Sequence, residues 1–329
     1  MSPRILVIRF SSMGDILLTT PVLRALRQKY PKAEIHYLTK AKFREAIETH
    51  PVPDKIWYLE NSLSEIIRQL QAVRFDLIVD LHASLRSALV RFQLDGNKLV
   101  FPKNSLKRWT WLKLGIGKPD PRHVVEKYLA AIQPLGAFGD GEGLDFRIVP
   151  ETETQVQSEC KAIFGADKPV AVVLAATYNT KKWPVEHYVR FLKNLNKSFV
   201  LLGGPGEAAM GEKILSEVKG GINRCGKCSL QESASWLKVS AFVITHDTGL
   251  MHLSAALKKS TFVIWGNTTP ELGMYPWRTE HYNHEVKGLG CRPCTHLGHA
   301  ECPKGHFACM RNNDPDRLLG MVNFSRPEG

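Results

Sequence analysis

Near the start of the chain, the apolar run ILVIRF (residues 5–10) is followed at once by the polar segment SSMGD (residues 11–15). Residues 20–30 then place apolar side chains at helical spacing. A buried strand, a polar loop and an amphipathic helix in this order form the first part of a βαβ unit. The alternation continues, with strand-like segments at 34–38, 55–59 and 75–81 and helix-like segments at 42–49 and 62–73. We therefore expect an α/β fold with a doubly wound parallel sheet.

A glycine-rich segment separates two such alternations. Residues 136–150 begin with GAFGDGEG, which has four glycines in eight residues and the periodicity of neither a helix nor a strand. Beyond it, strand-like segments at 170–176, 198–202, 241–245 and 261–265 alternate with helix-like segments at 151–164, 185–195, 208–218 and 250–257. The sequence predicts two Rossmann-like domains, 1–150 and 151–329, that face each other across a cleft.

The composition narrows the class of protein. Of the 329 residues, 43% are hydrophobic and 23% are charged, which is typical of globular proteins and excludes a disordered chain. Apolar runs stay well below the roughly 18–20 residues that span a bilayer, so we expect no transmembrane segment. Seven cysteines are too few for a disulfide scaffold, which favours the cytoplasm. The net charge of +12 suits nucleic acid, an acidic membrane surface or a phosphorylated molecule, although many basic proteins have no such partner.

The segment 11–15 is the first candidate site, because loops at the carboxyl ends of parallel strands collect ligands. Gly14 would let a ligand approach the backbone, and Asp15 would supply a carboxylate. The segment is not a phosphate-cradling loop, since it has one glycine and no lysine. The alternative is that Asp15 only caps the next helix.

Two segments of the second domain are candidates for a phosphate site. In THDTGLMH (residues 245–252), Gly249 stands at a predicted helix N-terminus, which favours a diphosphate. Thr248 would cap that helix or donate to a phosphate. In TYNTKKWP (residues 177–184), Lys181 and Lys182 precede another helix and form a possible phosphate clamp. A capped helix with a half-buried histidine and a solvated lysine loop are the alternatives.

The segment LKRWTWLKL (residues 106–114) interleaves Lys107, Arg108 and Lys113 with tryptophan and leucine. Such a pattern suits lipid head groups or single-stranded nucleic acid. The alternative is a surface helix that packs its apolar face on the core.

Four cysteines near the C-terminus have the ligand type and density of a structural zinc site. They are Cys291, Cys294, Cys302 and Cys309. Reduced thiols or one labile disulfide are the alternatives. The pair Cys225 and Cys228 is open to the same interpretations.

Three motifs, taken in their order and spacing, resemble glycosyltransferase family 9, the ADP-heptose:lipopolysaccharide heptosyltransferases. They are SSMGDIL with Thr20-Pro21, KKWP at 181–184 and DTGLMH at 247–252. The resemblance covers nearly the whole chain and implies a GT-B fold, which consists of two facing Rossmann-like domains.

The resemblance also implies roles for individual residues. Asp15 matches the catalytic base, and the acceptor side of the same motif is formed by Ser11, Ser12, Met13 and Gly14. The implied donor-binding residues are Thr177, Lys181, Lys182, Gln231, Asp247, Thr248, Gly249, Leu250 and His252. Among them, Lys181 matches the phosphate-contacting lysine, Asp247 lies near the donor sugar and Gln231 is placed near the ribose. Lys107, Arg108 and Lys113 would meet the acceptor at the membrane.

The implied activity is an inverting transfer of heptose from ADP-heptose to a lipopolysaccharide core acceptor, either Kdo or heptose. A lysine and a helix N-terminus can stabilise the leaving diphosphate, so we expect no metal cofactor for catalysis. We expect a cytoplasmic enzyme, peripheral at the inner membrane, that binds no nucleic acid. The alternatives are a GT-B transferase with another nucleotide sugar, a GT-B relative that binds without catalysing, and a basic nucleic-acid-binding protein with a zinc tail.

Overall fold

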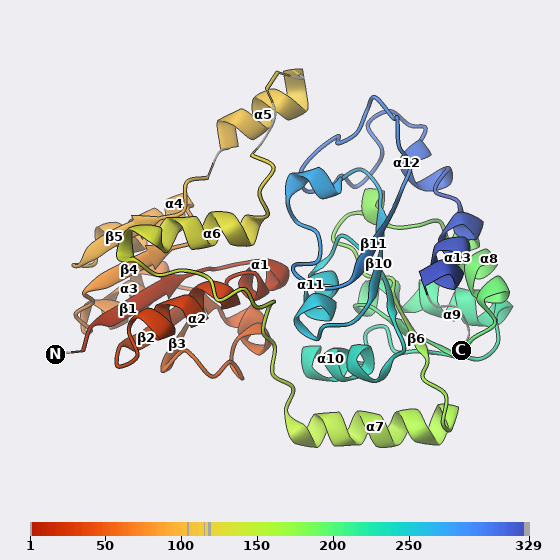
Figure 1. The fold of residues 1–329 in the computed structure, drawn as a ribbon, viewed down its shortest axis with the longest axis horizontal. Coiled ribbons are helices and arrows are strands. Elements are labelled where there is room, and N and C mark those ends of the chain that lie inside the picture. Colours follow the sequence, from red (N-terminus) through yellow and green to blue (C-terminus); the bar gives the residue numbers. More distant parts are fainter. Residues whose placement is uncertain (1, 104, 115, 118–119, 326–329) are drawn as a thin grey trace. The chain divides into compact units, whose positions relative to one another are not determined.

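The computed structural model describes residues 2–103, 105–114, 116–117 and 120–325. These residues form two compact units. One consists of the residues up to Trp111 together with Gly117–Arg147, and the other consists of Leu112–Ile116 together with the residues from Ile148 onward. Each unit is built on one parallel β-sheet (Figure 1). The predicted domain boundary, residue 150, is the first residue of helix α7 (Pro150–Phe164).

The sheet of the first unit has the strand order β3-β2-β1-β4-β5, and all its neighbouring strands are parallel. Its strands are β1 (Arg4–Ile8), β2 (Glu34–Lys40), β3 (Lys55–Leu59), β4 (Leu77–Asp80) and β5 (Asn97–Val100). Its helices are α1 (Met13–Leu17), α2 (Thr20–Lys29), α3 (Leu63–Gln71), α4 (Leu85–Phe92) and α6 (Val124–Ile132), with 3₁₀ turns at Ala41–Ala46 and Gln133–Leu135. Helix α5 (Ser105–Leu114) is divided between the two units.

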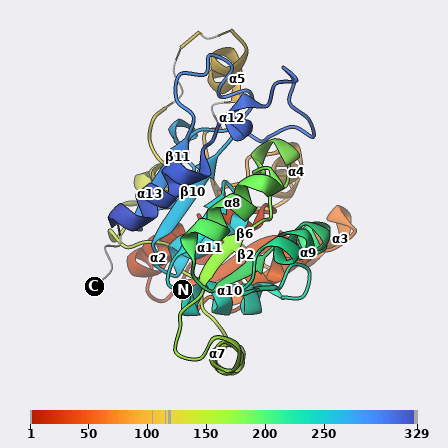
Figure 2. The same cartoon turned by 90° about the vertical axis from the view of Figure 1, so that its right-hand side faces the viewer.

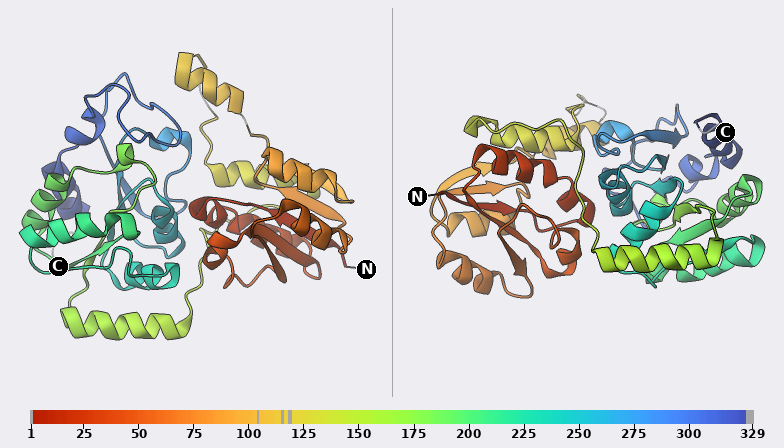
Figure 3. Two further views of the ribbon diagram at one scale, coloured as in Figure 1. Left: turned by 180° about the vertical axis from the view of Figure 1, so that it is seen from behind. Right: turned by 60° about the horizontal axis from the view of Figure 1, so that its bottom comes forward.

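Side-chain alternation along β1 decides which helices cover each face of this sheet. Leu6 and Ile8 of β1 pack with Ile67 of α3 and Val90 of α4 in one buried cluster. Helices α2 and α6 contact each other and lie over the opposite face (Figures 1 and 3). The Ser84 hydroxyl accepts a hydrogen bond from the first turn of α4 and so fixes where that helix begins.

The sheet of the second unit has the strand order β11-β10-β9-β6-β7-β8 and is also parallel throughout. Its strands are β6 (Val170–Val173), β7 (Phe199–Leu202), β8 (Gly221–Asn223), β9 (Val243–His246), β10 (Thr261–Trp265) and β11 (His281–Glu285). Besides α7, its helices are α8 (Val185–Leu195), α9 (Ala208–Glu217), α10 (Leu230–Val239), α11 (Gly249–Ala256), α12 (Ala308–Arg311) and α13 (Pro315–Ser325). Short 3₁₀ turns lie at Asn179–Lys181, Pro205–Glu207 and Pro270–Leu272.

Helices cover both faces of this second sheet. Helix α8 contacts α9 and α13 on one side, whereas α10 and α11 contact each other on the other side (Figures 1 and 2). Every residue of β6, β7, β9 and β10 is buried, as expected for central parallel strands. The predicted fold class, two Rossmann-like parallel-sheet domains, is confirmed.

Some elements differ from the prediction. Residues 42–49, predicted as helical, form a 3₁₀ turn at Ala41–Ala46 that is interrupted by non-helical backbone at Phe43. The polar segment after β1 is partly helical, because α1 begins at Met13. None of the described helices is long and apolar enough to cross a membrane.

Candidate active site

Asp15 is held in the first turn of the short helix α1, directly after β1. Its Oδ2 atom accepts hydrogen bonds from the Ser12 backbone N–H at 3.0 Å and from the Ser12 hydroxyl at 2.7 Å. Its Oδ1 atom lies 2.8 Å from Nη2 of Arg9. The carboxylate therefore caps the helix, as the alternative interpretation had it, and also forms an ion pair. Both contacts fix its position at the carboxyl end of β1.

Arg9 holds the Asp15 carboxylate in position. Its guanidinium donates to the Leu81 carbonyl at 2.7 Å, to the Tyr128 hydroxyl at 2.9 Å and to the Ser11 carbonyl at 2.7 Å. Burial opposes its charge, but the nearby Tyr128 and Asp15 outweigh that effect and raise the pKa of Arg9. One buried cation thus ties the Asp15 loop to the end of β4 and to α6.

His82 joins this cluster two residues after β4. Its ring lies edge-on to Phe10, with the ring centroids 5.2 Å apart. Burial, followed by the positive charges of Arg9 and Lys103, lowers the pKa of His82 to about 4. A neutral imidazole therefore stands near Asp15 at the same sheet edge. Sequence analysis missed it, because a single histidine after a strand carries no distinguishing pattern.

In the second unit, Lys181 reaches the segment after β9. Its Nζ atom lies 2.6 Å from Oδ2 of Asp247 and donates to the Asp247 carbonyl at 3.2 Å. Both side chains are largely shielded, with 12% and 13% of their surfaces exposed. Two of the predicted donor-binding residues therefore meet, although 66 residues separate them in the sequence.

Helix α11 begins immediately beside this pair. Thr248 is its N-cap, and the Thr248 hydroxyl accepts the Leu250 backbone N–H at 3.0 Å. No acidic residue occupies the first turn of α11, so the positive end of its dipole is not offset there. Because β6 and β9 are neighbouring parallel strands, their carboxyl ends bring Lys181, Asp247 and Gly249 to one edge of the sheet.

The other predicted donor-binding residues lie differently. Lys182 pairs with Glu207 at 2.7 Å, not with Asp247. The Gln231 side chain is buried and accepts the Val149 backbone N–H at 3.0 Å. His252 is also buried, whereas Thr177 is exposed.

Comparison with known proteins decides the family. A family model described as glycosyltransferase family 9 (heptosyltransferase) matches residues 63–304, more than two thirds of the chain. The chain belongs to glycosyltransferase family 9. It is therefore an enzyme, a glycosyltransferase, and the resemblance inferred from the three motifs is confirmed.

Relatives of the family 9 chain are similar over most of their length. Lipopolysaccharide heptosyltransferase 1 of Campylobacter coli is 26% identical over 290 residues, which cover 80% of this chain and 84% of that protein. The family 9 glycosyltransferase structure from Veillonella parvula has a TM-score of 0.81 at 19% identity and covers 100% of this chain and 98% of that one. The Escherichia coli heptosyltransferase WaaC with ADP-2-deoxy-2-fluoro heptose has a TM-score of 0.69 at 20% identity, with coverage of 98% and 99%. These likenesses show the GT-B fold.

The cysteine-rich segment of this family 9 chain lies against the candidate phosphate site. The His299 backbone N–H donates to the Thr180 hydroxyl at 2.8 Å, and the Cys294 N–H donates to the Asn267 carbonyl at 3.1 Å. The Cys291 Sγ atom lies 3.9 Å from Nε2 of His306. Burial and the neighbouring thiols raise the pKa of Cys294.

Over the described ranges, which include all four C-terminal cysteines, no three His, Cys, Asp or Glu side chains are arranged to hold a metal ion. Zinc binding stays a prediction, which metal analysis of the purified, reduced protein tests.

The basic aromatic segment forms helix α5. Lys107 is exposed, and so is 53% of Trp109. The side chains of Arg108 and Lys113 lie outside the described part of the chain.

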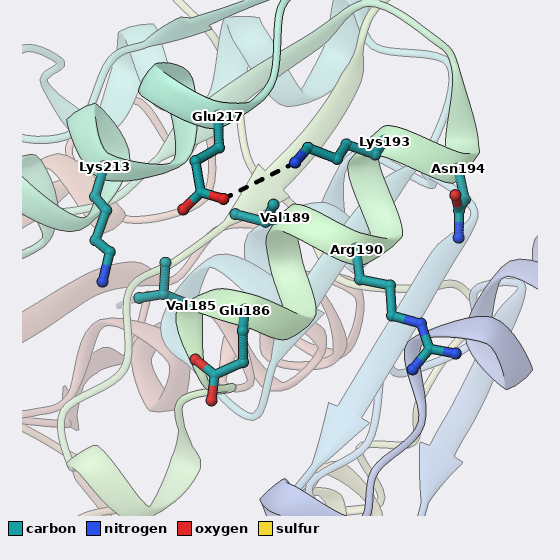
Figure 4. A pocket seen from close by; sticks show the side chains of 8 residues that line it. All are labelled: Val185, Glu186, Val189, Arg190, Lys193, Asn194, Lys213 and Glu217. Atoms are coloured by element: carbon teal, nitrogen blue, oxygen red, sulfur yellow. Dashed lines mark ion pairs between the residues drawn. The ribbon is translucent and has the colours of Figure 1, made fainter.

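A pocket between α8 and α9 contains none of the predicted site residues. It is lined by Val185, Val189 and charged or amide side chains of both helices, and Lys193 lies 3.9 Å from Glu217 (Figure 4). These are surface groups with 53% and 46% of their side chains exposed, so we assign this pocket no function.

His246, the last residue of β9, is a structural residue that sequence analysis did not single out. It is fully buried, and its Nε2 atom accepts hydrogen bonds from the Trp183 N–H at 3.3 Å and from the Tyr188 hydroxyl at 2.9 Å. It thereby attaches the lysine loop to β9. Burial first, and then the charges of Lys182 and Lys181, lower the pKa of His246 to about 3.

This histidine predicts a loss of stability in acid. Below about pH 6.5 His246 becomes protonated in the unfolded chain but stays neutral in the folded chain. The free energy of unfolding therefore falls as the pH drops toward 3. Between pH 7 and pH 5, the free energy of unfolding of His246→Gln should therefore fall by about 2 kcal/mol less than that of the wild type. Urea unfolding at the two pH values measures this difference. His281→Gln, at a half-exposed histidine, is the control, and equal losses for wild type and His246→Gln would refute the prediction.

Proposed function

We propose that this family 9 enzyme transfers heptose from ADP-heptose to a lipopolysaccharide core acceptor, either Kdo or heptose, with inversion and without a metal. The observation that carries the proposal is the cationic Lys181 beside the N-terminus of α11 at one sheet edge. An ammonium group and a helix N-terminus are the two features that suit a diphosphate. The choice of ADP-heptose as the donor is supported by the heptosyltransferase WaaC, whose structure holds an ADP-heptose analogue.

In the proposed reaction, Lys181 and the first turn of α11 stabilise the charge that develops on the leaving diphosphate. Asp247, which faces Lys181, lies beside the donor sugar. When the diphosphate binds, its oxygens replace the Asp247 carboxylate as partners of the ammonium group. Thr248 holds the helix end in place through its bond to the Leu250 N–H.

Asp15 is the proposed general base. It takes the proton from the acceptor hydroxyl while the diphosphate leaves from the opposite face of the anomeric carbon. One carboxylate is enough for such a single displacement, since no sugar–enzyme bond forms. Arg9 and Ser12 are positioning residues, because they hold the Asp15 carboxylate.

Metal independence is part of the proposal. A divalent cation on the diphosphate would need oxygen ligands such as an Asp-x-Asp pair. The pair Asp314 and Asp316 occurs at the start of α13, but Asp316 forms an ion pair with Arg190 of α8. An excess of EDTA should therefore leave the transfer rate unchanged.

The acceptor is lipid-linked under this proposal. The enzyme would then work in the cytoplasm, peripherally at the inner membrane.

A donor screen tests the proposal most directly. ADP-heptose should bind and raise the stability by about 2.7 kcal/mol at a hundred times its Kd, and UDP- and GDP-sugars should bind far more weakly. Calorimetric titration and thermal unfolding measure both effects. Tighter binding of a UDP-sugar would show a transferase with another donor. Salt-sensitive retention on DNA without any nucleotide-sugar binding would replace the proposal by a nucleic-acid-binding protein.

A further inference from the structure

Helix α4 of the first unit carries a second apolar stripe on its outward side. Val90 faces the core, but Leu85, Leu89 and Phe92 are 87%, 52% and 87% exposed. Positions four and three residues apart share one face of a helix, so the three side chains form a continuous stripe. Together with Ala88, Arg91 and Lys98 they line a shallow hollow of about 590 Å³.

The segment that carries this stripe is rich in positive charge. Between residues 81 and 118 there are eight Lys and Arg residues and one acid, Asp95, so this segment has a net charge of 8 − 1 = +7 out of +12 for the whole chain. Arg86 and Lys98 are exposed beside the stripe, and the exposed Lys103 lies near His82, which precedes α4. Arg91 pairs with Asp80 at 2.8 Å. Lys98 at the hollow and Arg86 on the same helix therefore favour an anionic partner.

Exposed apolar side chains also concentrate in this segment. Within the described residues, five of the eleven large apolar side chains that are exposed lie between residues 85 and 109 of the first unit. Scattered single apolar residues are normal on a protein surface, but a gathered set marks a binding surface.

We propose that the outward face of α4, formed by Leu85, Leu89 and Phe92 and accompanied by the exposed cations Arg86, Lys98 and Lys103, docks on a bilayer that contains anionic lipid. The leucines and the phenylalanine enter the boundary between head groups and acyl chains, and the cations contact lipid phosphates. Three side chains on one short helix are too small a surface for a stable dimer, which buries about 800 Å² per partner. Two of its three side chains are leucines, which offer no stacking surface to the bases of a nucleic acid.

The position of α4 links this surface to the proposed reaction, on which this step rests. Helix α4 starts at the carboxyl end of β4, and Asp15 lies at the carboxyl end of the neighbouring β1. His82, between β4 and α4, is close enough to Arg9 and Lys103 for both charges to influence its pKa. Docking through α4 would therefore hold the Asp15 edge of the first sheet near lipid-linked acceptors.

Sedimentation of the full-length protein with vesicles tests the inference. The wild type should bind vesicles of phosphatidylethanolamine with phosphatidylglycerol and should not bind vesicles of phosphatidylcholine alone. Leu85→Gln/Phe92→Gln should lower the partition coefficient at least about tenfold, because the apolar contact is lost. Lys98→Gln/Lys103→Gln should lower it about 10- to 30-fold at low salt. Leu85 and Phe92 are so exposed that replacing them should leave the fold intact, and circular dichroism checks this.

A matched control distinguishes binding through α4 from non-specific binding by exposed apolar side chains. Phe138→Gln/Ile163→Gln removes two exposed apolar side chains elsewhere and should bind vesicles as the wild type does. Wild-type binding by the α4 variant, equal binding to neutral vesicles, or loss of a dimer in light scattering would each overturn the inference. The inference would also be overturned if the α4 variant bound vesicles normally but had a raised KM for acylated acceptor alone. The stripe would then be a site for the acyl chain. Vesicle binding without any heptose transfer would refute the proposed function and leave the docking surface standing.

Discussion

Replacing Asp15 by Asn should lower the rate of heptose transfer by about 100- to 10,000-fold, the usual effect of losing a general base. The amide cannot take the proton of the acceptor hydroxyl, whereas the diphosphate contacts belong to other residues. ADP-heptose affinity should therefore change by no more than about twofold. Initial rates with saturating acceptor, together with calorimetric titration of the donor, measure the two quantities separately.

The control for Asp15→Asn must lose an ion pair without losing the base. Asp54→Asn is suitable, because Asp54 pairs with Arg27 at 2.5 Å on the first unit, before β3. This variant should keep the wild-type transfer rate. A near-normal rate for Asp15→Asn would remove Asp15 from the mechanism. A large loss of donor affinity would instead assign Asp15 to the donor.

Lys181→Met should lower kcat/KM by about 100- to 1000-fold, since one charged donor to a developing anion is worth this much. Two effects combine in this variant. The leaving diphosphate loses its ammonium partner, and the Asp247 carboxylate, now without its cation, repels the incoming phosphates. Steady-state kinetics with varied ADP-heptose measure the loss.

Two further variants make the Lys181 prediction specific. Lys182→Met should lose less than about tenfold, because Lys182 pairs with Glu207. Lys181→Met/Asp247→Asn should recover part of the donor affinity, which a double-mutant cycle measures as coupling between the two side chains. Equal losses for the two lysine variants would contradict the assignment of Lys181 as the phosphate contact.

The fold was predictable where apolar patterns are long and regular. The bounds of β3, α8 and β10 agree with the predicted 55–59, 185–195 and 261–265. Helix α1 has five residues, too few to show a helical period. Strand β11 reads His-Tyr-Asn-His-Glu, which lacks the apolar pattern of a buried strand because it lies at an edge of the sheet.

The sequence predicts which residues belong to the candidate site, but not how their side chains pair. Motif order singled out Asp15, Lys181 and Asp247, yet nothing in the sequence shows which carboxylate a lysine meets. Lys181 and Lys182 are adjacent in the chain, but their ammonium groups pair with Asp247 and Glu207 respectively. Such choices depend on contacts between segments far apart in the sequence, so only the folded chain reveals them.

The contact between Lys181 and Asp247 has a consequence for selectivity. Before any donor arrives, the ammonium group already has an internal counter-ion at 2.6 Å. An incoming ligand must displace the Asp247 carboxylate from the ammonium group. A small anion that offers only one phosphate therefore binds with little net free energy. Under the proposed function, a nucleotide sugar would add contacts from its base and sugars, and these would supply the free energy needed to displace the carboxylate. The contact thereby keeps the Lys181 ammonium group neutralised in a cell that is rich in phosphate.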